Sequence, residues 1–361
     1  MRNFFSAFLR KIAEMLEKND LKATKLQASS QKIHEIIEPD FQTLSLAKEE
    51  VQEGIIDDGV SIPKMVGPQK KLDQKKKKEI ISYPDIPIRD VIDLMEFPFL
   101  ALSKDRINPI TYESEDKTQR VEISGHRGHF IASIYDWDII LVVAGKIQEI
   151  LNNSSDVPPK KIIMPRHELL KALHRQDGKR QHQDLEKSLD RLKLTGINTT
   201  VNNKDFRYRS GFGFIDRWGY LERKNNKEIK VIHITLSDWL YELCCAQGSL
   251  LKSDRSYFEL TSGLKRFLYR TARKHAGNNR DGWEFTIKKL YEKSGSEREF
   301  KKFKSDLMAA VIENNIPDYT MQFINKNNKN YILFKPKTNI DKIEQLINNV
   351  EVRVIDKKII N

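Results

Sequence analysis

The chain is 361 residues long, with a formal net charge of +12 at pH 7 and 32% charged residues. This length is sufficient for two domains that each bury a core. The positive charge suits a polyanionic partner, either nucleic acid or an anionic membrane face, although an ordinary basic cytosolic protein has the same balance. The two cysteines, Cys244 and Cys245, are adjacent, which excludes a framework of structural disulfides and fits the reducing cytoplasm.

The first 82 residues are predicted to form an extension ahead of the folded part of the chain. Residues 2–18 have the pattern of a basic amphipathic helix with one apolar stripe, made of Phe5, Phe8, Ile12 and Leu16. Such a helix packs on the body or on a partner protein, or else contacts a membrane surface. Residues 20–82 include the run KKLDQKKKKE and are expected to form a partly disordered linker. No apolar run reaches the roughly 18 residues of a membrane span, and no secretory signal is expected.

Residues 83–247 are predicted to form a first domain with four helices and several strands. Strands are expected at 110–113 and 119–124, then a buried helix over 134–151 and a short helix over 166–173. A longer basic helix over 180–194 follows. After it come the remaining expected elements: strands at 197–201, 206–215 and 228–236, and a helix over 237–246.

The basic helix over 180–194 has one apolar face and one polar face. Its leucines recur at helical spacing, and four polar residues lie on or beside the outward face: Arg180, Gln183, Lys187 and Arg191. In the hairpin that follows, Arg207 and Arg209 alternate with aromatic residues. These six side chains are candidate DNA-binding residues.

Residues 248–338 are predicted to form a second domain, and residues 339–361 a C-terminal tail. A helix begins after Thr261 and Ser262, and a short helix over 287–293 has Thr286 as its expected N-cap. A third helix over 297–314 is followed by two strands that join at a polar turn over 326–329. The candidate DNA-binding residues here lie on the polar face of the third helix and in the turn: Arg298, Lys301, Lys302, Ser305, Lys326 and Lys329.

Both halves have the order helix, short helix, basic helix, hairpin. This order is typical of a winged-helix domain, which presents its third helix to a DNA major groove and its hairpin to the backbone. The sequence therefore predicts an α+β fold of two tandem winged-helix domains with a helical or disordered N-terminal extension.

Motifs for catalysis, metal binding and cofactor binding are absent from the sequence. The segment GSLLKS lacks the spacing of a phosphate-binding loop. His126 and His129 form the closest histidine pair, and no cysteine or carboxylate cluster completes a metal set there. Tyr220 and Lys224 match the tyrosine half of a rolling-circle nickase pattern, but His233 has no second histidine two residues away. No enzyme activity, metal or cofactor is expected.

Six segments of the chain resemble a known family. They are LMEFPFLALSK (94–104), IYDWDIILVVA (134–144), DLEKSLDRLKLT (184–195), LSDWLYE (236–242), SYFELTSGLKRFLYRTARKHAG (256–277) and EKSGSEREFKKFKSDL (292–307). Together they resemble the plasmid replication initiator protein A family. The resemblance implies a non-catalytic protein that binds repeated sites on double-stranded DNA at a plasmid origin. It also implies tandem winged helices, host replication proteins such as an initiator and a helicase as partners, and self-repression by homodimers.

Three other functions compete with the initiator hypothesis. A winged-helix transcriptional repressor has the same fold, and fold alone does not fix function. A nicking enzyme would cut supercoiled origin DNA, and a nucleoid protein would bind without sequence preference. Repeated protected sites on DNA that flanks the gene would favour the initiator.

Overall fold

The computed structural model describes residues 87–113, 117–153, 157–202, 207–222 and 229–338. All of them belong to one compact unit of the chain. The predicted helix over 2–18, the linker over 20–82 and the tail over 339–361 lie outside the described residues.

The first half of this unit surrounds helix α3 (Trp137–Asn153), which is buried along most of its length. Its core positions are apolar on every side, as expected for a helix that neighbours cover all round. The other elements of this half are β1 (Arg89–Val91), η1 (Ile92–Met95), β2 (Ile110–Glu113), β3 (Gln119–Gly125), η2 (His126–Gly128), β4 (Lys161–Pro165), α4 (Arg166–Ala172), α5 (Lys179–Leu194), β5 (Thr195–Asn202), β6 (Arg207–Gly213), β7 (Ile215–Glu222), β8 (Ile229–Leu236) and α6 (Asp238–Cys245).

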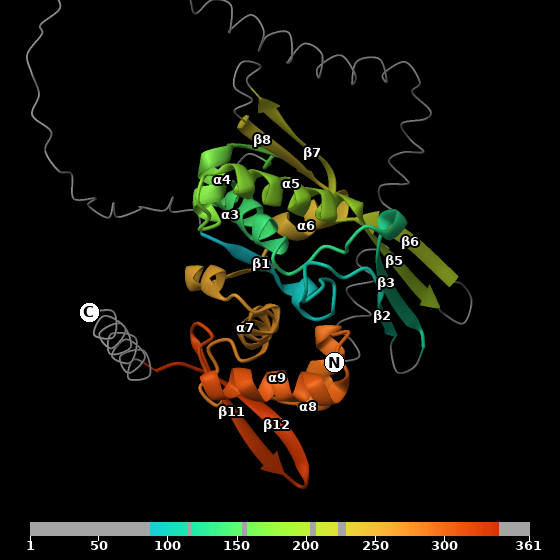
Figure 1. Ribbon diagram of the computed structural model, residues 1–361, viewed down its shortest axis with the longest axis vertical. Helices are drawn as coiled ribbons and strands as arrows, with labels where there is room; N and C mark the ends of the chain where they lie inside the picture. Colours follow the sequence, from blue (N-terminus) through green and yellow to red (C-terminus); the bar gives the residue numbers. More distant parts are fainter. Residues whose placement is uncertain (1–86, 114–116, 154–156, 203–206, 223–228, 339–361) are drawn as a thin grey trace, which may run out of the picture. The chain divides into compact units, whose positions relative to one another are not determined.

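The second half is smaller and contains the C-terminal hairpin. Its elements are β9 (Leu250–Lys252), η3 (Arg255–Glu259), α7 (Gly263–His275), β10 (Trp283–Thr286), α8 (Ile287–Ser294), α9 (Phe300–Glu313), β11 (Tyr319–Lys326) and β12 (Lys329–Pro336). In Figure 1, α8 and α9 lie beside the hairpin β11–β12, which extends beyond them. The mixed helices and sheets of both halves agree with the α+β prediction.

Local chemistry explains the elements of the second half. The Thr286 hydroxyl accepts a hydrogen bond from the Lys289 amide, so the predicted N-cap of α8 is confirmed. Gly295 ends α8 in the left-handed conformation, where a Cβ would lie 2.7 Å from Pro98. Asn327 and Asn328 both have positive φ angles, which is the requirement of the tight turn that joins two twisted strands.

The same order of elements occurs in the two halves. In the first half α3, β4, α4 and α5 precede the hairpin β7–β8, and the sheet order is β4-β8-β7. In the second half α7, β10, α8 and α9 precede the hairpin β11–β12, and the sheet order is β10-β12-β11. In each sheet the strand that comes last in the chain lies in the middle: β8 lies between β4 and β7, and β12 lies between β10 and β11.

The predicted hairpin of strands 197–201 and 206–215 forms as β5 and β6, but it does not occupy the position of β11–β12. Strands β5 and β6, which carry Arg207 and Arg209, join β2 and β3 in a separate four-stranded sheet of order β2-β3-β5-β6. The hairpin in the position of β11–β12 is β7–β8, and β7 was not expected as a strand. Its sequence IDRWGYLE is exposed or half-buried after Ile215, so it lacks the alternation that marks a half-buried strand.

Two buried ion pairs connect the halves across the predicted boundary at residues 247 and 248. Arg270 of α7 donates to both carboxylate oxygens of Asp90 on β1, at 2.5 and 3.1 Å. Arg266 of α7 pairs with Asp138 in the first turn of α3. All four side chains are at most 8% exposed, so their charges must stay paired.

A third cluster surrounds Glu96, which follows η1. Its carboxylate lies 2.7 Å from Lys293 Nζ, 2.9 Å from Lys274 Nζ and 3.3 Å from His275 Nε2. Burial alone would raise the pKa of Glu96, but the His275 hydrogen bond and the two lysine charges hold it well below its usual range. Burial lowers the pKa of Lys293 to about 8 although Glu96 opposes this shift, and burial also lowers the pKa of His275.

Removing the Glu96 charge should destabilise the fold in a pH-dependent way. We expect Glu96→Gln to lower the free energy of unfolding by about 3 kcal/mol at pH 5.5, because it leaves Lys293 buried and uncompensated. Without Glu96 the folded-state pKa of Lys293 falls further below 8, while the unfolded value stays near 10.5. In the folded variant Lys293 therefore loses its proton at a lower pH than in the folded parent, and above that pH the unfolded variant binds more protons than the folded one. The free energy of unfolding of the variant then rises with pH, so its difference from the parent should shrink as the pH rises towards 8.

Urea unfolding of both proteins between pH 5.5 and 9 measures this difference. Glu149→Gln is the matched control, because Glu149 pairs with Lys146 at the surface and its loss should stay below about 1 kcal/mol. A loss for Glu96→Gln that does not vary with pH would contradict the coupling to Lys293.

Candidate nucleic-acid interface

Helix α5 has the two faces that the sequence predicted. Leu185, Leu189 and Leu192 are buried, and Arg180, Gln183 and Lys187 are exposed on the other side. The start of the helix is fixed by Asp177, which accepts hydrogen bonds from Arg166 of α4 and from the His182 ring at 3.0 Å each. The three exposed residues therefore project from an anchored helix with donors and acceptors that match base edges and phosphates.

Arg191 is a correction to the predicted outward face. Its guanidinium donates two hydrogen bonds to the Asp136 carboxylate, at 2.8 and 2.6 Å, and its side chain is 14% exposed. Burial lowers the pKa of Arg191, but the hydrogen bonds and charge of Asp136 outweigh it and leave the pKa above its ordinary value. Arg191 thus holds α5 against the loop before α3 and is not available to a partner.

Helix α9 presents Lys301, Lys302 and Ser305 to solvent, as predicted. Arg298 differs from the prediction because α9 begins at Phe300 and Arg298 lies in the bend that precedes it. There it donates a hydrogen bond to Asp306 at 2.8 Å across the first turns of the helix. Lys304, which the sequence did not single out, is also exposed, so α9 carries three unburied lysines.

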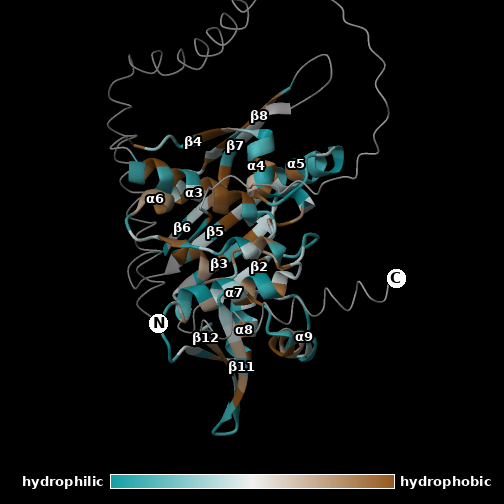
Figure 2. Cartoon of the chain, turned by 90° about the vertical axis from the view of Figure 1, so that its left-hand side faces the viewer, coloured by the Kyte–Doolittle hydropathy of each residue, from teal (hydrophilic) through white to brown (hydrophobic). Residues whose placement is uncertain are grey.

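The strand residues lie on two different sheets. Lys326 and Lys329 flank the tip of the hairpin β11–β12, which is the hydrophilic end of that hairpin in Figure 2. Lys326 pairs with Glu284 of β10 at 2.7 Å, and both are partly exposed. Arg207 and Arg209 are exposed on β6, in register with Asn202 and Thr200 of β5. The structure therefore does not bring all twelve predicted residues into one patch.

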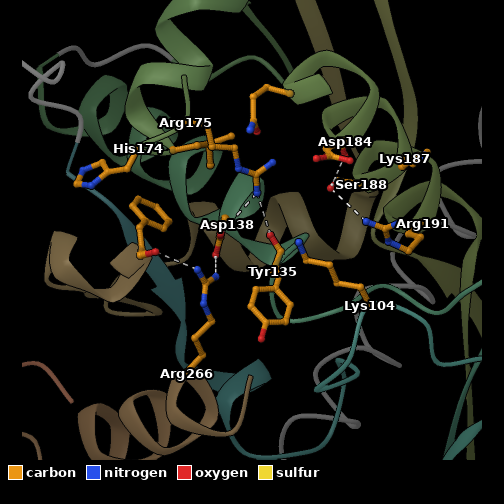
Figure 3. Close-up of a pocket in the computed structure, with 13 residues that line it drawn as sticks. Lys104, Tyr135, Asp138, His174, Arg175, Asp184, Lys187, Ser188, Arg191 and Arg266 are labelled. Atoms are coloured by element: carbon orange, nitrogen blue, oxygen red, sulfur yellow. Dashed lines mark hydrogen bonds and ion pairs between the residues drawn. The ribbon is translucent and has the colours of Figure 1, made fainter. Parts of the chain in front are cut away.

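A polar cavity of about 260 Å³ opens between α5 and the N-terminal end of α7. Figure 3 shows Lys104 and Arg175 reaching towards the same space, from the loop after η1 and from the turn after α4. Lys187 and Arg191 of α5 also line it, together with Arg266 and Asp138. This cavity could not be predicted from the sequence, because its walls come from segments far apart in the chain.

The family model described as "Replication initiator protein A" matches residues 89–321. The chain belongs to the replication initiator protein A family. The predicted resemblance is therefore confirmed, and it covers most of the described residues.

A relative and a solved structure agree with this assignment. The chain is 32% identical over 254 residues to a protein of Wigglesworthia glossinidia brevipalpis that carries the name of a replication protein, covering 69% of this chain and 90% of the relative. The crystal structure of domains 2 and 3 of RctB aligns with a TM-score of 0.53 at 13% identity, covering 68% of this chain and 98% of that one. At this identity the structural likeness supports the fold alone.

Two residues of the nickase pattern, Tyr220 and His233, lie on the adjacent strands β7 and β8. Tyr220 is 40% exposed on β7, with its ring 6.2 Å from that of Trp218. Lys224 lies outside the described residues, and His233 is on β8 opposite Ile163. Within the described ranges there is no group of three or more metal-ligating side chains. In the same ranges, no helix combines the length and hydropathy needed to cross a bilayer.

Arg191 and Lys187 offer a test of which α5 side chains are structural. We expect Arg191→Ala to lower the free energy of unfolding by about 3–5 kcal/mol, because Asp136 is 1% exposed and would lose its partner. Lys187→Ala removes the same charge from the exposed side of the helix and should change stability by less than about 0.5 kcal/mol. Chemical denaturation of the two variants and the parent measures both values. Equal stability of the two variants would show that the Arg191 pair is dispensable.

Proposed function

We propose that this protein initiates plasmid replication by binding repeated sites on double-stranded origin DNA through two winged-helix modules. In this proposal α5 and α9 read bases in the major groove, while the hairpins β7–β8 and β11–β12 lie along the backbone. The observation that carries the proposal is the equivalence of α5 and α9. Each is the third helix of the same order of elements, and each has an exposed basic face opposite a buried apolar one.

The chemistry of the exposed side chains supports this reading. Lys187 on α5 and Lys301 and Lys302 on α9 can contact guanine or phosphate, and Gln183 can make paired hydrogen bonds to adenine. A solvated charged face explains any one of these residues equally well. It explains less well why both basic faces occupy the same place in two halves with different sequences.

We further propose that the protein recruits the host initiator and helicase to the opened origin and that dimers repress its own gene. These roles follow from the family, and no described surface identifies the contact. The protein is proposed to act without catalysis, so its output is the assembly of other proteins on DNA.

Footprinting on DNA that flanks the gene tests the base-reading helices. We expect Gln183→Ala/Lys187→Ala and Lys301→Ala/Lys302→Ala each to weaken specific binding by at least about tenfold, since one good base contact contributes about 1–3 kcal/mol of discrimination. Each pair should change protection at a different part of the repeat, because the two helices occupy separate grooves. Lys161→Ala, an exposed lysine on β4, is the control and should bind like the parent. Wild-type protection by both double variants would refute the assignment of α5 and α9.

The strand residues should behave as backbone contacts. If Arg207, Arg209, Lys326 and Lys329 touch phosphates, each alanine substitution should weaken binding to specific and random DNA equally. Each lost contact should reduce the slope of log K against log salt by about 0.9. Binding titrations at several salt concentrations measure this slope, and an unchanged slope for all four would remove these strands from the interface.

A further inference from the structure

The polar cavity beside α5 has more positive than negative charge in its walls. Five cationic side chains line it, Lys104, Arg175, Lys187, Arg191 and Arg266, against two carboxylates, Asp138 and Asp184. Asp136 pairs with Arg191 from outside the lining. Even with that carboxylate counted, the site keeps an excess of two positive charges.

Two of these cations have no carboxylate partner among the described residues. Neither Lys104 nor Lys187 forms an ion pair with any residue that the structure describes, whereas Arg191 and Arg266 are held by Asp136 and Asp138. The Lys104 ammonium lies 4.9 Å from the centre of the Tyr135 ring, and the Arg266 guanidinium lies 4.7 Å from the same centre. An anion bound in the cavity would supply the opposite charge that Lys104 lacks among the described residues.

The buried part of the cavity is rigid. Arg266 is 5% exposed, and it is held by Asp138 and by the carbonyl oxygens of Leu260 and Phe258. Arg175 reaches the Tyr135 carbonyl and lies 3.7 Å from Asp138. The cavity wall is therefore organised before a ligand arrives, which lowers the entropic cost of binding.

We propose that this cavity binds a phosphate group. Inorganic phosphate or a phosphomonoester carries a charge of about −1.5 to −2 at pH 7, which matches the excess of two. A phosphodiester of a DNA backbone carries one charge and would neutralise half of it, as a carboxylate would. The cavity volume of about 260 Å³ leaves room for a phosphate group. Lys104 and Arg175 reach towards the space that the anion would fill (Figure 3), and Lys187 lines it from α5.

The phosphate has two possible sources, and the experiment separates them. It is either free in solution, as inorganic phosphate or the terminal phosphate of a small molecule, or it belongs to the backbone of DNA bound along α5. The second source rests on the proposed function, and the first does not.

The first arm is a thermal unfolding titration of the full chain with inorganic phosphate at constant ionic strength, with chloride as the reference salt. If the site takes free phosphate, saturating phosphate should raise Tm by at least about 2 °C in the parent and in Lys161→Gln. Lys104→Gln should abolish most of this rise. Lys104 and Lys161 are both exposed, so both variants should fold.

The second arm measures binding to random-sequence DNA as a function of salt. If a backbone phosphate fills the cavity, inorganic phosphate leaves Tm unchanged, and Lys104→Gln reduces the salt slope by about 0.9 while Lys161→Gln does not. The proposal is overturned if neither the phosphate-dependent Tm nor the salt slope differs between Lys104→Gln and Lys161→Gln. If the parent protein binds no DNA, the proposed function is refuted, and the phosphate titration alone then tests whether the cavity binds phosphate.

Discussion

Three buried aspartate–arginine pairs around the start of α3 hold the described unit together. Asp90 forms an ion pair with Arg270, Asp138 with Arg266, and Asp136 with Arg191. Trp137, between two of these aspartates in the sequence, donates its indole N–H to Asp90 at 2.9 Å. Buried pairs add little net stability relative to apolar residues, but breaking one leaves a buried charge and costs about 3–5 kcal/mol. Their main effect is therefore to fix geometry, because α5 and α7 must both meet α3 in one arrangement.

This geometry bears directly on the proposed function. Arg191 belongs to α5, the proposed reading helix of the first half, and Arg270 and Arg266 belong to α7, the first helix of the second half. The Glu96 cluster adds a contact between η1, α7 and α8. Two base-reading helices can recognise one site with a defined spacing only if the protein holds them at a fixed separation. The ion pairs fix α5 and α7 relative to α3 and tie α8, the neighbour of α9, to α7.

Local signals in the sequence predicted many individual elements but not how the strands pair. Some signals act over only a few residues, so they can be read directly from the sequence. They are the N-cap Thr286, the all-round apolar pattern of α3 and the Asn327–Asn328 turn. The pairing of β5 with β3 joins residues at least 70 positions apart, and strand register over that distance is set by packing rather than by local pattern. The β5–β6 hairpin was predicted, but its place in the four-stranded sheet was not, for this reason.

The same distinction applies to the candidate interface. Helical spacing placed Arg180, Gln183 and Lys187 on the exposed side of α5, but it could not reveal that Arg191 meets Asp136 from a segment 55 residues earlier. Arg298 was placed on α9 because the start of a helix without a strong cap is hard to read. The cavity beside α5 was not predicted because Lys104, Arg175 and Arg266 are far apart in the sequence and come together only in the folded chain.

We propose that α5 and α9 lie in DNA major grooves at the same time. Site-directed cleavage tests it most directly: an iron chelate is attached to a cysteine at Gln183→Cys or Lys302→Cys, in a Cys245→Ser background. Cys244 is buried and needs no replacement. We predict cleavage from both positions within each origin repeat, at two separate places on the duplex and with the strand offset of the major groove. Cleavage from only one position, or from neither while the repeat is still bound, would contradict the account.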